Sequence, residues 1–168
     1  ERFDLEMARM VSGDPRTGNL LDWLLHNTTM LRYDDVRHFH FWPQFRAFLL
    51  WEMEKECSEE KRRAVFSRGA LYYELKEDYA HALECYTRCG DHAKVSELLV
   101  RNAELHPGMG HYSEMEKYYR SLPEAEIAAS PALMQGMSML CALSADYDGS
   151  ERWYGCLKPV SYTHLRAH

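Results

Sequence analysis

The chain has 168 residues, of which 46% are hydrophobic and 12% aromatic, and its formal net charge at pH 7 is −6. This composition provides enough apolar side chains for a packed core and excludes an intrinsically disordered chain. The acidic balance disfavours a protein that binds nucleic acid or anionic membranes non-specifically. No apolar run approaches the roughly 18 residues of a membrane-spanning helix.

The cysteines indicate a reducing compartment. There are five, an odd number, and none belongs to a CxxC pair. Cys85 and Cys89 lie four residues apart, so a regular helix carries both on one face, where a disulfide is hard to close. We therefore expect reduced thiols and a cytoplasmic protein.

Helical periodicity dominates the sequence. Asp14 before Pro15 is typical of an N-cap followed by the first residue of a helix, and Ser58 before Glu59 is a second such start. Apolar residues at helical spacing, separated by Gly and Pro, predict the remaining boundaries. The expected helices span residues 2–11, 15–26, 43–57, 59–76, 78–88, 91–104, 111–121, 131–145 and 149–157.

The period changes between the second and third expected helices. The segments 30–33 and 36–41 flank Asp34 and Asp35, which predicts two short strands joined by a tight turn. A lone hairpin is marginally stable in water, so it should lean on the helices beside it. Two helices, a hairpin and a following helix together predict a winged-helix-like segment over residues 1–57.

Residues 58–158 have the pattern of paired helices. Small and large side chains fall at the spacings of a tetratricopeptide helical pair, and a weaker pair runs from Met134 to Trp153. The residues of the first pair are Phe66, Gly69, Ala70, Tyr73, Ala82 and Tyr86. We therefore predict a mainly α fold, in which stacked antiparallel helical hairpins follow the winged-helix-like segment as a degenerate tetratricopeptide-like α-solenoid.

Residues 159–168 differ in character from the rest of the chain. Their sequence resembles a translated sequencing adapter, so we expect these residues to form a non-native tail outside the fold. Because the tail replaces the next helical pair, the last helix should expose an apolar face formed by Trp153, Tyr154 and Leu157. Such a patch favours self-association.

No catalytic motif is recognisable. The sequence contains no GxSxG, no HExxH and no P-loop, so we expect neither an enzyme nor catalytic residues. His38 and His40 lie two residues apart on an expected strand, but nothing near them supplies a third ligand. We therefore predict no metal site.

Tyrosines gather in the expected helical pairs. A tyrosine ring offers a large apolar face and a polar group, which suits a groove that binds a small molecule or a peptide. The alternative is that these rings pack between helices. The candidate groove residues are Tyr73, Tyr86, Tyr112, Tyr118 and Tyr119.

Several short segments, taken in order, resemble the MalT-like transcriptional regulators of bacteria, which are ATP-dependent and end in a LuxR-type helix-turn-helix. The resemblance covers about residues 12–155. The matching segments are Asp14–Leu25, Pro43–Leu49, Tyr73–Glu74, Ala82–Glu84, Cys89–Asp91, Glu97–Leu99, Ser121–Pro123 and Pro131–Leu133. The resemblance implies the winged-helix end of a nucleotide-switch ATPase module of the STAND class, followed by the start of a tetratricopeptide-like sensor region.

That resemblance implies a fragment of a signal-responsive transcriptional regulator. The fragment would bind a small-molecule inducer or a regulatory protein and take part in oligomerisation, without a membrane partner. DNA would be contacted only by a C-terminal domain outside it. The alternative that the sequence leaves open is a tetratricopeptide-type protein–protein interaction scaffold unrelated to DNA binding.

The resemblance also implies ATP or ADP as the cofactor of the full-length protein, but not of this fragment. The family usually has a His-Pro pair at the start of the segment matching Pro43, and here Trp42 stands at the histidine position. An indole has a single uncharged N–H donor and cannot replace an imidazole at a phosphate. No nucleotide contact is therefore assigned to any residue.

Overall fold

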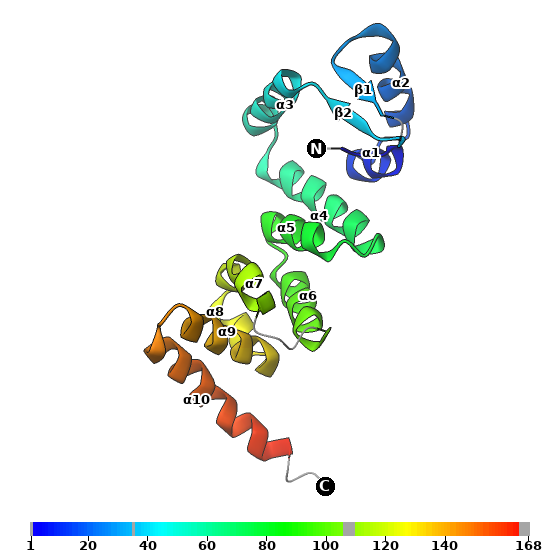
Figure 1. Ribbon diagram of the computed structural model, residues 1–168. Coiled ribbons are helices and arrows are strands. Elements are labelled where there is room, and N and C mark those ends of the chain that lie inside the picture. Colours follow the sequence, from blue (N-terminus) through cyan, green and yellow to red (C-terminus); the bar gives the residue numbers. More distant parts are fainter. Residues whose placement is uncertain (1, 35, 106–109, 165–168) are drawn as a thin grey trace. The chain divides into compact units, whose positions relative to one another are not determined.

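The computed structural model describes residues 2–34, 36–105 and 110–164. Within them it contains ten helices and one two-stranded antiparallel sheet, which confirms a mainly helical protein with one small hairpin (Figure 1). The contacts divide the chain into two compact units, Glu1–Cys89 and Gly90–His168. The boundary expected after residue 57 falls inside the first unit.

The first unit contains five helices and the sheet. Its elements are α1 (Leu5–Ser12), α2 (Thr17–Asn27), β1 (Leu31–Tyr33), β2 (Phe39–Phe41), α3 (Pro43–Glu56), α4 (Glu59–Leu75) and α5 (Tyr79–Cys89). The expected cap of α4 is confirmed, because the Ser58 hydroxyl accepts a hydrogen bond from the Lys61 N–H. The expected start of α2 at Pro15 is wrong. Asp14 instead binds the backbone N–H and the guanidinium of Arg16, and the helix begins at Thr17.

The hairpin forms with a longer loop than the sequence predicts. Leu31 pairs with Phe41, but the loop extends from Asp34 to His38, so His38 does not lie on a strand. The Asp34 carboxylate accepts hydrogen bonds from the backbone N–H groups of Val36 and His38, at 3.0 and 2.9 Å. These hydrogen bonds stabilise a connection longer than the tight turn that was expected.

The hairpin leans on its neighbours, as expected. Leu21 of α2, Leu31 and Phe39 form a small buried core. Phe3 adds a short extended segment to the edge of β2 through two backbone hydrogen bonds with Phe39. Its ring also lies 5.3 Å from that of Phe41, centroid to centroid. Burial of these rings supplies the stability that an isolated hairpin lacks.

Three of the helix connections share one turn chemistry. A residue in the left-handed region is followed by an aspartate, whose carboxylate accepts a hydrogen bond from a backbone N–H three residues later. The left-handed residue ends one helix and the aspartate caps the next, so a few residues suffice to connect two helices. The pairs are Glu77–Asp78, Gly90–Asp91 and Ala145–Asp146.

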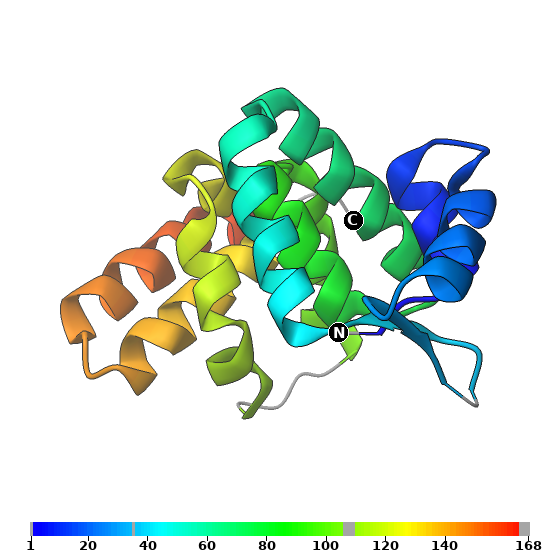
Figure 2. The same ribbon diagram turned by 90° about the horizontal axis from the view of Figure 1, so that it is seen from above.

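The second unit is entirely helical within its described residues. It comprises α6 (His92–Leu105), α7 (Gly110–Ser121), α8 (Glu124–Ala128), α9 (Pro131–Leu143) and α10 (Tyr147–His164). Helices α9 and α10 form the antiparallel pair expected between Met134 and Trp153, visible as the yellow-to-orange hairpin in Figure 2. Helix α8 was not predicted, because five residues are too few to show a helical period.

The apolar face expected on the C-terminal helix is not formed as predicted. Trp153 is only 6% exposed, so it belongs to the core and not to an uncovered apolar face. Of the three residues expected to form that face, Tyr154 is exposed at 58% and Leu157 is half-buried. Helix α10 also includes residues 159–164 of the tail expected to lie outside the fold, and residues 165–168 lie outside the described part.

A close approach between α7 and α9 fixes the centre of the second unit. Tyr119 is 1% exposed, and its ring lies against the backbone of Gly136. A β-carbon added at Gly136 would stand 2.6 Å from Tyr119 Cζ and 2.7 Å from Cε1. At these distances the ring or the helix would have to shift, so the absence of a side chain at Gly136 permits this packing.

We predict that Gly136→Ala destabilises the second unit by about 2 kcal/mol, because the overpacking outweighs the better helix propensity of alanine. Urea unfolding followed by circular dichroism measures the change. Gly155→Ala is the matched control, since no atom lies within 4 Å of the added β-carbon on α10. It should be neutral or stabilising, and equal effects of the two substitutions would contradict the packing argument.

Candidate functional site

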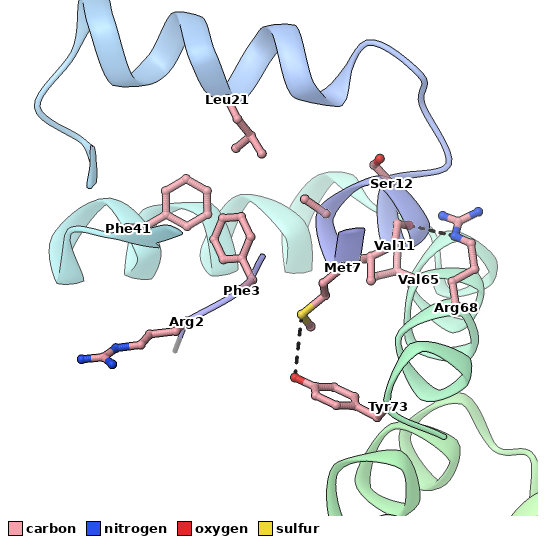
Figure 3. A pocket seen from close by; sticks show the side chains of 11 residues that line it. Arg2, Phe3, Met7, Val11, Ser12, Leu21, Phe41, Val65, Arg68 and Tyr73 are labelled. Atoms are coloured by element: carbon pink, nitrogen blue, oxygen red, sulfur yellow. Dashed lines mark hydrogen bonds between the residues drawn. The ribbon is translucent and has the colours of Figure 1, made fainter. Parts of the chain in front are cut away.

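An apolar pocket of about 390 Å³ lies in the first unit, between the segment before α1, helices α1, α2 and α4, and the end of β2 (Figure 3). Phe3, Leu21, Phe41 and Val65 supply apolar surface from four different elements. Helix α4 contributes the charged Arg68 at one side and the hydroxyl-bearing Tyr73. A pocket of this size with few polar groups suits a small organic molecule.

The pocket exists because α1 docks on α4 through a partly buried anchor. Asp4 caps α1, and its Oδ1 accepts a hydrogen bond from the Met7 N–H at 2.6 Å. Its Oδ2 accepts a second one from the hydroxyl of Tyr72 on α4 at 2.8 Å. One carboxylate therefore starts α1 and fixes that start against α4.

Further polar contacts follow along the same interface. Lys76 Nζ lies 2.8 Å from Glu6 Oε2, and the Tyr73 hydroxyl lies 3.9 Å from Met7 Sδ. At the other end of α1, the Arg68 Nε donates to the backbone carbonyl of Val11 at 2.8 Å. Contacts at both ends of α1 set its direction across α4, which leaves the pocket beside it.

Small residues let the helices approach. Gly69 on α4 is buried, and a β-carbon there would stand 3.8 Å from both Val11 on α1 and Cys85 on α5. Ala70 and Ala82 are completely buried where α4 and α5 pair. The small residues that the sequence singled out therefore lie at helix contacts.

The anchor changes the acidity of both of its partners. Burial raises the pKa of Asp4, but the hydrogen bonds from Met7 and Tyr72 and the charge of Lys76 outweigh it, and the pKa falls below the ordinary 3.8. Burial, and then the hydrogen bond to Asp4, raise the pKa of Tyr72. At neutral pH, Tyr72 therefore remains protonated, and its hydroxyl donates a hydrogen bond to the charged carboxylate of Asp4.

The five candidate groove tyrosines are divided between the two units. Tyr73 lines the pocket in the first unit. Tyr86 is buried there, and its hydroxyl donates to Glu74. Tyr112, Tyr118 and Tyr119 are buried in the second unit, at 7%, 6% and 1% exposure. Burial of four rings favours the packing role that the sequence left as an alternative, and their part in a groove stays a prediction.

Two of the three rings of the second unit contact each other, and the third contacts a lysine. Tyr112 and Tyr119 lie 6.3 Å apart, centroid to centroid, and the Lys117 ammonium lies 4.7 Å from the ring centroid of Tyr118. Burial and the neighbouring Tyr112 raise the pKa of Tyr119. These residues stabilise the junction of α7 and α9 and leave little ring surface accessible to a ligand.

Helix α3 carries a row of three aromatic residues, of which one is half-buried and two are exposed. Phe45, Phe48 and Trp51 follow one another at three-residue spacing, with neighbouring centroids 6.3 Å apart. Phe48 and Trp51 are 50% and 54% exposed, and no residue of α3 is buried. We call these three residues the α3 aromatic row. An apolar row of this kind is typical of a contact surface.

Trp42 precedes α3 with its ring under the guanidinium of Arg32, 4.1 Å from the centroid. The indole is therefore engaged by a cation-π contact at the position where the resembling family has histidine. His40 lies opposite Arg32 in the sheet. Within the described ranges, no group of three His, Cys, Asp or Glu side chains is placed to hold a metal ion.

Comparisons with protein families, with curated proteins and with solved structures found no match. In the described part of the chain, no helix combines the length and the apolar character needed to cross a membrane.

The sequence reasoning missed the two polar residues that matter most at this site. Asp4 lies inside the helix expected over residues 2–11, but α1 begins at Leu5, and an aspartate directly before a helix is a recognisable N-cap. Arg68 interrupts the small and apolar positions of the segment 65–73 and lies on the same face of α4 as Val65 and Tyr72. A cation on an otherwise apolar helix face was the available signal.

We predict that Asp4→Asn lowers the stability of the first unit by about 1 kcal/mol at pH 7, because asparagine retains the cap but loses the charge. A depressed pKa makes the stabilisation complete above the unfolded value and progressively lost as the pH falls below about 4. The stability difference between wild type and variant should therefore shrink in acid. Urea unfolding at several pH values measures it.

Asp22→Asn is the control for that experiment, since Asp22 is exposed on α2 and its ion pair with His26 lies at the surface. Exposed pairs contribute little to stability. We expect a small change without the acid dependence. A difference for Asp4→Asn that persists unchanged at low pH would contradict the assigned role of the charge.

Proposed function

We propose that this chain is a ligand- and partner-binding region of a signal-responsive transcriptional regulator of the MalT-like kind, and that it has no catalytic role. The order of the short segments supports the regulator class. The observation that carries the binding role is the pocket, whose walls come both from the winged-helix-like segment and from the first helical hairpin. A cytoplasmic location accords with the five cysteines, none of which forms a disulfide.

The pocket offers a route from binding to signalling. A ligand in it would touch α1, α2 and β2 on one side and α4 on the other. It would therefore bind most tightly to the arrangement in which α1 lies on α4, and would shift the population toward that arrangement. In a full-length regulator, this shift would couple inducer binding to the neighbouring nucleotide-switch module.

The winged-helix-like and tetratricopeptide-like interpretations belong to the same proposal. Helices α1 and α2, the hairpin and α3 follow one another in the order from which the sequence predicted a winged-helix-like segment. Helices α4 and α5 pair through the buried Ala70 and Ala82, with Tyr86 as a large partner residue. Small residues under large ones are the packing chemistry of helical repeats.

The reading frame on either side of this chain tests the regulator class. We expect a GxxxxGK[ST] loop upstream and a helix-turn-helix of LuxR type downstream, because the resemblance places the nucleotide switch before this region and DNA binding after it. Sequencing the source locus through both ends checks this. Further helical pairs with neither module would overturn the transcription proposal and leave a binding scaffold.

The α3 aromatic row favours the scaffold alternative, in which the chain binds a protein partner or a second copy of itself. We predict concentration-dependent self-association through this row, because apolar rings on a surface gain free energy when covered. Phe48→Glu should weaken it, since a carboxylate would have to be buried at the contact. Sedimentation velocity from low to high micromolar protein measures the effect.

Leu50→Glu is the matched control, because it replaces another exposed apolar residue of α3 with the same charge, on the side of the helix opposite the row. We expect the control to associate like the wild type. A wild-type chain that stays monomeric throughout, or an equal loss of association in both variants, would remove the row as the self-association surface.

A further inference from the structure

We propose that the pocket of the first unit binds a small carboxylic acid with an apolar chain or ring, whose carboxylate pairs with Arg68. This inference rests on the proposed ligand-binding function and names the chemical class of the ligand. It goes beyond the tyrosine groove expected from the sequence, because it assigns recognition to a cation on α4.

Arg68 is a cation without an anionic partner. Within the described residues no carboxylate forms an ion pair with it, and its one hydrogen bond to protein runs from Nε to the Val11 carbonyl. Some other arginines on helices are paired one turn back, as in Arg63 with Glu59 at 2.7 Å and Arg88 with Glu84 at 3.0 Å. Arg68 has Ala64 at that position and cannot pair in this way.

The lack of an anionic partner matters because of where Arg68 lies. Its side chain is half-buried, and it lines the apolar pocket. A partly buried charge beside apolar walls is costly until an opposite charge meets it. A guanidinium held through Nε still presents its terminal N–H groups, and a carboxylate is the acceptor whose geometry matches them.

The second arginine of the pocket does not compete for the ligand's charge. Arg2 and Arg68 lie on opposite sides of the pocket (Figure 3). Arg2 lies 3.6 Å from Asp34 and is largely exposed, so its charge is already offset. The pocket therefore combines one uncompensated cation at one side with apolar surface elsewhere, which favours a ligand with one acidic end.

The apolar walls define the rest of the ligand. Phe3, Phe41 and Leu21 surround the space away from Arg68, and Met7 is a side chain that adapts its shape. A chain of several methylene groups or a phenyl ring would gain free energy by covering these residues. Octanoate and 4-phenylbutyrate carry both features and serve as probes.

Calorimetric titration of the full chain tests the proposal directly. We expect octanoate and 4-phenylbutyrate to bind at least about tenfold more tightly than octanamide and 4-phenylbutanamide, which keep the apolar part and lose the charge. Arg68→Met should weaken binding of the acids about tenfold or more and leave the amides unchanged. Arg63→Met, on the same helix, should change neither.

A second variant guards against a folding defect in Arg68→Met, which also loses the contact to Val11. Ala8 lines the pocket, and Ala8→Leu should reduce binding of acids and amides alike by occupying space. Equal affinity of acid and amide for the wild type would overturn the proposal, as would acid binding that survives Arg68→Met. If no probe binds while the flanking regulator modules are present, the carboxylate inference fails and the proposed function stands.

Discussion

The contact between Asp4 and Tyr72 is the interaction on which the first unit depends. One carboxylate caps α1 and accepts a hydrogen bond from α4, across 68 positions of sequence. Without it, the start of α1 would have unsatisfied N–H groups, and the hydroxyl of the buried Tyr72 would lose its acceptor. Arg68 repeats the arrangement at the far end of α1 by binding the Val11 carbonyl. These two contacts hold the helix in place and thereby create the pocket.

This construction explains why the pocket suits a signalling role. Its walls come from elements far apart in sequence, and their arrangement depends on a few polar contacts and a small apolar core. A ligand there would add its binding free energy to the joint between α1 and α4. Docking of α1 on α4 would then become more stable when the ligand is bound, and this is how we propose that the inducer acts.

Much of the fold could be predicted from local signals. The breakers and caps located nine of the helices, since Pro, Gly and Asp act on the backbone next to them. The hairpin loop was mispredicted, because the Asp34 side chain reaches backbone N–H groups two and four residues away and competes with a tight turn. Trp153 was expected to be exposed, but it is buried. The site was largely missed, because the Asp4–Tyr72 contact carries no periodicity.

A double-mutant cycle between Asp4 and Tyr72 tests the central claim most directly. Asp4→Asn, Tyr72→Phe and the combined variant would be compared with the wild type by urea unfolding at pH 7. Since both side chains belong to one hydrogen bond to a charged group, we predict a coupling free energy of about 1 kcal/mol or more. Additive effects, with a coupling free energy near zero, would contradict the claim that this contact holds α1 on α4.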